Sequence, residues 1–201
     1  MSTPAEESGS RREVIAENAI RLIARDGVRS LTHRAVDREA QIPAGSTSYY
    51  AKTRRALIEL IVERLAARSS ADAQALAQML GAATATRQIF GVGELSGLVA
   101  QLIERLSART EDMRARYALL LELDDEPALR AKLTDRSQVH NLAKQVSAEG
   151  LSGAGLPVSD ARVDELIALA DALVFQRVVV DASTPVEAIL TAYLTGIVDV
   201  D

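Results

Sequence analysis

The amino-acid sequence predicts an all-α fold, and three observations support this prediction. Apolar residues recur at every third or fourth position through most of the chain, which is the spacing of helices with one buried face. Aromatic residues make up only 3% of the chain, and alternating, strand-like runs are few. Apolar residues make up 48% of the 201 residues, enough to bury a substantial core. We therefore expect packed helices with short connections.

The first predicted helix spans residues 11–26. Gly27 follows it and is placed to end it in a left-handed conformation. The preceding residues, 1–10, are acidic and rich in small side chains, without the apolar stretch of a signal peptide, so we expect them to be disordered. The apolar face of the first helix consists of Ile15, Ala19, Leu22 and Ile23.

Two short helices joined by a tight connection come next. Thr32 is a suitable N-cap for a helix over residues 33–40. Pro43 is acceptable in the first turn of another short helix, over about 44–50. Residues 31–50 therefore have the pattern of a helix-turn-helix, whose second helix is short.

A longer helix follows, capped by Thr53 and running towards Leu80. We expect a loop over residues 81–94, which contain three glycines. The remaining predicted helices span about 95–107, 112–123, 127–150, 159–174 and 186–198.

Charge is distributed unevenly along the chain, although its net value is −5. Residues 11–55 contain ten Lys/Arg and five Asp/Glu, a net charge of +5, whereas the residues after them carry −8. A basic head on an acidic body is typical of a DNA-binding module joined to a part that does not touch DNA. We therefore divide the chain into a lead at 1–10, a helix-turn-helix domain at 11–56 and a helical domain at 57–201.

The second helix of the helix-turn-helix pattern offers small and polar side chains, as a helix that enters the major groove must. Gly45 lets the backbone approach the duplex closely, and serine and threonine hydroxyls can bond to base edges or to phosphates. The residues concerned are Ala44, Gly45, Ser46, Thr47 and Ser48.

Groups beside this helix suit the phosphate backbone. The hydroxyls of Tyr49 and Tyr50 lie at its end, and Thr53 and Arg54 open the next helix, whose N-terminal amides favour an anion. Tyr49 could also simply pack between the first and fourth predicted helices, and we favour packing combined with a phosphate contact. His33, in the first turn of the preceding helix, is either a contact to the DNA backbone or an ordinary exposed residue.

These residues resemble the DNA-binding signature of the TetR family of repressors, over roughly residues 11–60. Two positions depart from the family pattern, because Ala51 stands where an aromatic residue is common and Tyr50 where histidine is common. The matching residues are Leu31-Thr32, Ile42-Pro43-Ala44-Gly45, Ser48-Tyr49-Tyr50, and Arg54 followed by Leu57.

The resemblance implies a dimeric one-component regulator whose helical domain senses a small ligand. It implies phosphate contacts for Thr32, Tyr49 and Arg54. It implies base readout at Arg34, Ala44, Gly45, Ser46 and Ser48. The full set of predicted DNA-binding residues is Thr32, His33, Arg34, Ala44, Gly45, Ser46, Ser48, Tyr49, Tyr50, Thr53 and Arg54.

Large side chains of the helical domain either line a ligand pocket or belong to plain core. The low aromatic content favours a pocket lined by aliphatic side chains, and so a lipophilic ligand. The candidates for this pocket are Phe90, Met113, Tyr117, His140 and Phe175.

The last two predicted helices carry more apolar residues than one helix hairpin can bury. Besides burial within the chain, this favours pairing with a second copy in a four-helix interface. The candidates for this homodimer interface are Leu166, Leu173, Ile189, Leu190, Tyr193 and Ile197.

Residue types that catalysis requires are scarce. The chain has no cysteine and only His33 and His140, and it contains neither a phosphate-binding glycine loop nor a dinucleotide fingerprint. We therefore expect no enzyme activity, no cofactor and no metal. No apolar run is long enough to span a bilayer, so we expect a cytoplasmic protein that is nucleoid-associated when bound to DNA.

The predicted function is that of a DNA-binding transcriptional regulator, a repressor that binds a palindromic operator as a dimer and that a small-molecule ligand releases. The alternative is a helical protein-interaction module without a ligand.

Overall fold

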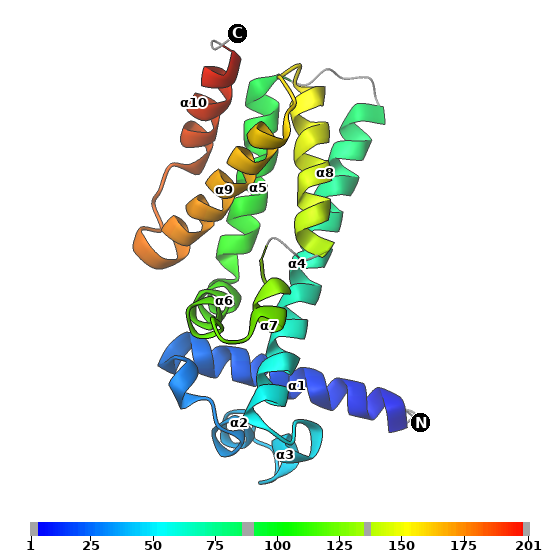
Figure 1. The fold of residues 1–201 in the computed structure, drawn as a ribbon, viewed down its shortest axis with the longest axis vertical. Helices are drawn as coiled ribbons and strands as arrows, with labels where there is room; N and C mark the ends of the chain where they lie inside the picture. Colours follow the sequence, from blue (N-terminus) through cyan, green and yellow to red (C-terminus); the bar gives the residue numbers. More distant parts are fainter. Residues whose placement is uncertain (1–3, 86–90, 135–137, 199–201) are drawn as a thin grey trace. The chain divides into compact units, whose positions relative to one another are not determined.

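A computed structural model describes residues 4–85, 91–134 and 138–198 of the chain (Figure 1). The described residues form helices joined by turns, and none of them lies in a strand, which confirms the predicted all-α fold. By its internal contacts the chain divides into two compact units. The head unit comprises the described residues up to Arg68 and those from Glu111 to Thr134, and the body unit comprises those of Ser69–Thr110 and those from Gln138 onwards.

This division differs from the predicted boundary between residues 56 and 57. α4 (Arg54–Ala85) contributes its first part to the head unit and the rest to the body unit. α7 (Pro127–Ala131) and nearly all of α6 (Thr110–Glu122) also belong to the head unit. These two helices join the head through contacts between residues far apart in the chain, which local sequence patterns do not report.

In the head unit, α1 (Pro4–Asp26) packs against α2 (His33–Glu39), and α2 packs against α3 (Ser46–Tyr50). A 3-10 turn over Val28–Ser30 joins α1 to α2. Gly27 ends α1 with a φ of +80°, the positive φ that the sequence predicted. Apolar faces of α1, α4, α6 and α7 share one core, whose members include Ile15, Ile23, Leu31, Leu57, Ile61, Leu119, Leu129 and Leu133.

α1 begins at Pro4, so the lead predicted to be disordered over residues 1–10 is helical from that position onwards. Proline suits the first position of a helix, because the amide that it lacks has no partner there. Alanine and glutamate, both good helix formers, follow it in the sequence. The composition of this segment was therefore a poor guide to its conformation.

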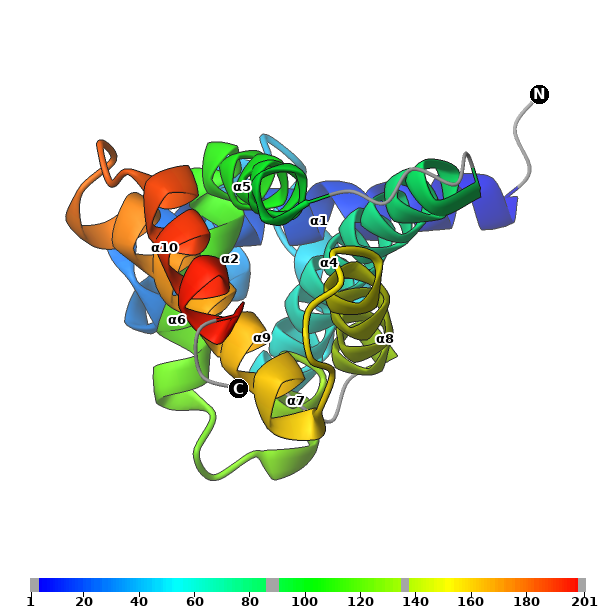
Figure 2. The same cartoon turned by 90° about the horizontal axis from the view of Figure 1, so that it is seen from above.

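In the body unit, α5 (Val92–Ala108) packs against α9 (Asp160–Phe175) and α10 (Val186–Val198), and α8 (Gln138–Gly153) packs against α9. Figure 2 shows α10 beside α5. A π-helical turn over Gln176–Val180 extends α9. The fully buried side chains of this unit include Leu95, Ile103, Leu151, Leu190 and Leu194.

α8 approaches α5 closely at Gly150. A Cβ atom at that position would lie 2.9 Å from Cδ1 of Leu95, closer than real Cβ contacts allow. Leu95 is itself 2% exposed, so the contact lies inside the body unit. Glycine at position 150 therefore sets how near these two helices can come.

The helix predicted over residues 127–150 is two helices, α7 and α8. After α7 the amides of Lys132 and Leu133 donate to the carbonyls of Leu129 and Arg130, at 3.1 and 2.9 Å, in a tight turn. This turn buries Leu133 next to the equally buried Leu129. Burial of both side chains favours the turn over a continuous helix.

Both ends of the segment 81–94, which was predicted to be a loop, are helical. α4 continues to Ala85, and α5 begins at Val92. The amide of Gly91 donates to the Glu94 carboxylate at 2.8 Å, which fixes the start of α5. Residues 86–90 lie outside the described residues.

Candidate nucleic-acid interface

Threonine side chains cap α2 and α4, as the sequence predicted. Oγ1 of Thr32 accepts a hydrogen bond from the Ala35 amide at 3.2 Å, and Oγ1 of Thr53 accepts one from the Ala56 amide at 3.1 Å. Each oxygen satisfies an amide that has no partner within its helix. Both threonines are exposed, so capping leaves them at the surface.

Asp37 of α2 caps α3 from outside that helix. Its Oδ2 accepts a hydrogen bond from the Gly45 amide and its Oδ1 one from the Thr47 amide, each at 2.8 Å. The residue is only 3% exposed. Gly45 has a φ of +91°, a conformation that favours glycine, and it leads directly into α3. The motif pattern alone did not point to Asp37, although an acidic residue on α2, eight residues before Gly45, is the signal that the sequence carries for this contact.

The same contacts decide the charge of the Asp37 carboxyl group. Burial disfavours the charged form and by itself raises the pKa of Asp37. The hydrogen bonds from Thr47 and Gly45, with the neighbouring His33, outweigh burial and hold this pKa below its usual value. Asp37 is therefore ionised at neutral pH.

The outward face of α3 and of the turn before it carries most of the residues predicted to read bases. Ala44, Gly45 and Ser48 are exposed. Ser46 is half-buried, and its hydroxyl donates to the Pro43 carbonyl at 2.6 Å. Thr47, which was expected to face the groove, is fully buried, so that expectation is wrong.

The two tyrosines at the end of α3 have different environments. Tyr49 is 78% exposed, which contradicts the interpretation that it packs between helices. Tyr50 is half-buried and packs against the core of the head unit. The rings meet edge to face with centroids 5.0 Å apart, so Tyr50 supports the exposed ring of Tyr49.

Two residues predicted as DNA contacts also form hydrogen bonds within the head unit. Nε2 of His33 lies 2.6 Å from the carbonyl oxygen of Ala51, a hydrogen bond that joins the start of α2 to the end of α3. The Arg54 guanidinium donates to the carbonyl of Leu31 and, at 2.9 Å, to that of Val28. These bonds fix the start of α4 against the connection between α1 and α2.

Cations of the head unit fall into two groups. Several are paired with carboxylates of other elements, among them Arg21 with Glu111, Arg25 with Glu39, and Arg55 with Glu126. Around α2 and α3, four exposed cations form no ion pair with any described residue: Arg29, Arg34, Arg38 and Lys52. The helix-turn-helix therefore presents four positive charges to an external anion.

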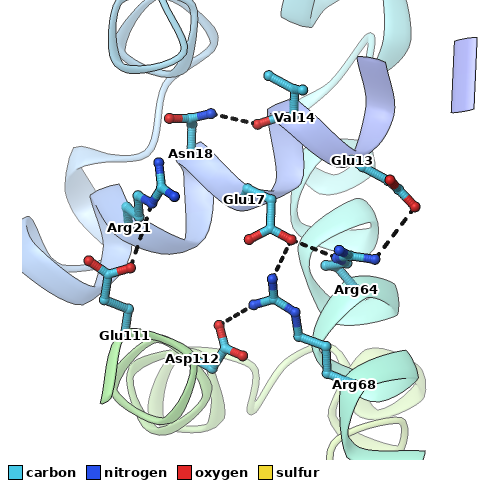
Figure 3. Close-up of polar contacts among 9 residues, drawn as sticks. All are labelled: Glu13, Val14, Glu17, Asn18, Arg21, Arg64, Arg68, Glu111 and Asp112. Atoms are coloured by element: carbon cyan, nitrogen blue, oxygen red, sulfur yellow. Dashed lines mark hydrogen bonds and ion pairs between the residues drawn. The ribbon is translucent and has the colours of Figure 1, made fainter. Parts of the chain in front are cut away.

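Ion pairs join three helices elsewhere in the head unit (Figure 3). Glu17 of α1 accepts hydrogen bonds from Arg64 and Arg68 of α4, at 2.7 and 2.5 Å. Arg68 also donates to Asp112 of α6 at 2.5 Å, and Asp112 is only 4% exposed. Arg68 is the last residue of α4 that belongs to the head unit. We call Glu17, Arg64, Arg68 and Asp112 the three-helix cluster.

Opposite charges favour the ionised forms of Glu17 and Arg68. Burial by itself raises the pKa of Glu17, but hydrogen bonds from Arg64 and Arg68 outweigh it and lower this pKa. Burial by itself lowers the pKa of Arg68, but Asp112 and Glu17 outweigh it and raise this pKa. The pairing therefore compensates for the partial loss of solvent around Glu17 and Arg68.

The predicted pocket residues are not brought together within one unit. Met113, which is buried, and Tyr117, which is half-buried, lie on α6 in the head unit. His140 of α8 and Phe175 of α9 lie in the body unit, and Phe175 is 42% exposed. Phe90 lies outside the described residues.

The predicted dimer residues are largely core of their own chain. Leu166, Leu173, Leu190 and Ile197 are each at most 5% exposed. Ile189 and Tyr193 are half-buried, and the Tyr193 hydroxyl donates to Glu165 at 3.0 Å. The assignment of the four buried residues to an intermolecular surface is therefore wrong, because they pack inside the body unit. Exposed small or aromatic residues of α9 are Ala161, Ala168, Ala172 and Phe175, beside the exposed Asp164, Glu165 and Asp171; those of α10 include Ala188, Ala192 and Thr195.

Other kinds of site find no support in the part of the chain that the structure describes. Its His, Asp and Glu side chains form no group of three that could hold a metal ion. Its helices include none with the length and apolar character needed to cross a membrane.

Comparisons with known proteins agree with this architecture. Residues 91–200, more than half of the chain, match the family "Tetracyclin repressor-like, C-terminal domain". No functionally curated protein matches the chain.

Several solved structures share the fold. The multidrug binding protein EbrR in complex with malachite green is 26% identical over 93% of this chain and 97% of its own, with a TM-score of 0.60. A transcriptional regulator from Rhodococcus sp. Rha1 is 18% identical over 94% of this chain and 96% of its own, with a TM-score of 0.71. A TetR-family member from Streptomyces coelicolor A3 is 24% identical over 93% of this chain and 97% of its own, with a TM-score of 0.60. The family match, together with the helix-turn-helix and the all-α body, shows that this chain belongs to the TetR family of transcriptional regulators.

Proposed function

We propose that this chain is a transcriptional repressor that binds a palindromic operator as a homodimer and that a small lipophilic molecule releases. The observation that supports DNA binding most strongly is the surface formed by α2 and α3. There, exposed hydroxyl groups and backbone lie among four cations without an ion-pair partner. Such a surface suits an anionic duplex better than it suits a protein partner.

Direct contacts are divided by residue type. Ala44, Gly45, Ser46 and Ser48 read base edges, together with Arg34. Thr32, Tyr49, Arg38 and Lys52 contact phosphates and position the head on the duplex. His33 and Arg54 contribute by holding the helix-turn-helix in shape, because their polar groups already bond to backbone carbonyls.

A binding assay with a matched control tests the DNA contacts. Operator duplexes are selected from a random library with the wild-type protein, and their affinity is measured by fluorescence anisotropy over a range of salt concentrations. We expect Lys52→Ala to weaken binding to all duplexes alike and to reduce the salt slope by about 0.9 per lost contact. Arg114→Ala removes an exposed cation from α6 and should leave both quantities unchanged.

Dimer formation is proposed for the exposed stripes of α9 and α10. Small side chains on both stripes allow helices of two copies to approach closely, and Phe175 adds an exposed aromatic surface at the end of α9. Two such helices from each copy make a four-helix interface. A two-fold dimer matches a palindromic operator, since both have the same symmetry.

Ligand release is proposed to act through α4 and α6. α4 runs from the head unit into the body unit, and the three-helix cluster bonds it to α1 and α6. A ligand that binds better when α4 has shifted must weaken DNA binding, and DNA must weaken its binding by the same factor.

Malachite green and ethidium, which are bound in structures of EbrR, are suitable first probes for this release. A rise in melting temperature identifies binding, and operator affinity with and without the probe then measures the coupling. The same titration on operator DNA alone corrects for binding of dye to DNA. A probe that stabilises the protein but leaves operator affinity unchanged at saturation shows no coupling for that ligand.

A further inference from the structure

The recognition helix α3 cannot hold its own position. It has five residues, and helices of that length are unstable without tertiary contacts. Its placement therefore depends on bonds from other elements, and the strongest candidate is the buried carboxylate of Asp37.

Asp37 binds two backbone amides at the start of α3, that of its N-cap Gly45 and that of its second residue, Thr47. Its two oxygens accept from the amides of Gly45 and Thr47, so α3 can neither rotate nor shift along its axis without breaking one of these bonds. Between these two amides lies Ser46, and Ser48 follows. The carboxylate thus fixes the segment whose outward face is proposed to read bases.

The charge of Asp37 is unusual for its place. An anion in a DNA-binding head repels phosphates, so its electrostatic effect alone weakens binding to any duplex. Its hydrogen bonds, in contrast, fix the position of α3. Contacts to bases depend on that position, whereas general attraction to phosphates does not. The two effects make opposite predictions for loss of the charge.

We propose that Asp37 is a positioning residue for sequence readout, which sets the ratio of operator affinity to random-DNA affinity by holding α3 in register with α2. The proposal rests on the proposed DNA-binding function. Asp37 would thus help to discriminate between bases although its side chain touches no base.

Asp37→Asn tests this proposal. Asparagine has nearly the shape of aspartate but keeps one acceptor oxygen, and its amide group would face one of the two backbone amides. We expect the ratio of operator affinity to random-duplex affinity to fall about tenfold or more, the size of a lost base contact. Affinity for random duplex should stay the same or rise, and the salt slope should stay constant.

Glu39→Gln is the matched control for charge. It removes one negative charge from the same helix, two residues away, at a side chain that bonds to Arg25 and not to α3. Operator and random duplexes should be affected alike, so their ratio should remain at the wild-type value.

Asp37→Glu separates position from charge in a second way. It keeps the negative charge but adds a methylene group that displaces the first turn of α3. Loss of discrimination in both Asp37 variants supports the positioning role. Both are assayed at temperatures well below their midpoints of thermal unfolding.

Three results would overturn the proposal. One is a folded Asp37→Asn protein that keeps the wild-type ratio. Another is a folded Asp37→Glu protein that keeps it, which would indicate that charge alone matters. The third is failure of both variants to fold, which would make Asp37 a residue of the fold and not of readout. A wild-type protein that binds no duplex with preference contradicts the proposed function itself, and that result is distinct from the other three.

Discussion

Arg54 illustrates how a residue type that suits DNA can be used within the protein. Its planar guanidinium presents several donors in a fixed fork, and here the fork meets two backbone carbonyls of the same chain. Those carbonyls belong to Leu31 and Val28, which lie in the connection between α1 and α2. Loss of DNA binding on mutation of Arg54 therefore cannot by itself identify a phosphate contact.

We expect Arg54→Lys to lower the free energy of unfolding by about 1–2 kcal/mol, because lysine keeps the charge but cannot bridge both carbonyls. Urea unfolding followed by circular dichroism measures this change. Arg55→Lys is the control, since Arg55 forms an exposed ion pair with Glu126 and should lose less than about 1 kcal/mol. Equal stability of the two variants would contradict the bridging role of Arg54.

The carboxyl group of Asp37 predicts a pH dependence of stability. Its pKa is lower in the folded protein than the usual value of 3.8, so its bonds contribute stability above about pH 4. That contribution is lost as the pH falls through the folded pKa. Wild type should therefore be more stable than Asp37→Asn at pH 7, and the difference should shrink on acidification towards pH 3. A difference that stays constant over this range argues against a bonded, ionised Asp37.

Helix packing predicts opposite effects for two glycines in the body unit. A Cβ at Gly150 of α8 would lie 2.9 Å from the buried Leu95 side chain, whereas a Cβ at Gly97 of α5 would have its nearest neighbour at 3.9 Å. Alanine favours the helix by about 0.5–1 kcal/mol at either site, but overpacking costs about 1–3 kcal/mol. We expect Gly150→Ala to lower the free energy of unfolding and Gly97→Ala to raise it.

Urea unfolding of both glycine variants tests this difference. Leu95→Ala should remove most of the penalty of Gly150→Ala, because it deletes the atom that the new Cβ would meet. If the Gly150→Ala protein is as stable as the Gly97→Ala protein, α8 and α5 can separate at little cost in free energy.

The three-helix cluster joins elements that are distant in sequence. Arg68→Met leaves the buried carboxylate of Asp112 without its Arg68 partner, and we expect the free energy of unfolding to fall by about 2 kcal/mol. This loss is smaller than that for fully buried ion pairs, because Arg68 is partly exposed. Arg64→Met breaks more exposed pairs and should cost less than about 1 kcal/mol. Asp112→Asn in the Arg68→Met protein should recover part of the loss.

Thermal and urea unfolding of these variants measure the contribution of the cluster to the free energy of unfolding. The proposed coupling adds a second expectation, that Arg68→Met alters the response of operator affinity to a bound probe more than Arg64→Met does. An Arg68→Met protein with wild-type stability and response would show that the cluster contributes neither to folding nor to signalling.

The assembly of two copies is tested on the exposed stripe of α9. Ala172→Glu places a charge on that stripe and should yield folded monomers, since a buried unpaired charge in an interface is costly. Gln101→Glu adds the same charge on an exposed position of α5 and should leave the dimer intact. Leu190→Glu should unfold the body unit, because Leu190 is fully buried within the chain. Sedimentation and circular dichroism distinguish these outcomes, and a dimeric Ala172→Glu protein would place the interface elsewhere.

Local patterns in the sequence were sufficient for most of the helices and for the DNA-binding motif, but not for the start of α1 or the division between α7 and α8. The caps at Thr32 and Thr53 and the positive φ of Gly27 follow from neighbours within a few residues, whose effects the sequence displays directly. The family resemblance was visible for the same reason, since its motif occupies a continuous segment.

Partners distant in the chain decided the remaining features. The roles of His33, Arg54 and Asp37, and the burial of Leu190, depend on which segments lie side by side after folding. The membership of α6 and α7 in the head unit has the same origin. A long polar side chain can bind an external phosphate or an internal carbonyl with the same chemistry, and only the folded positions of the two partners determine which one it meets.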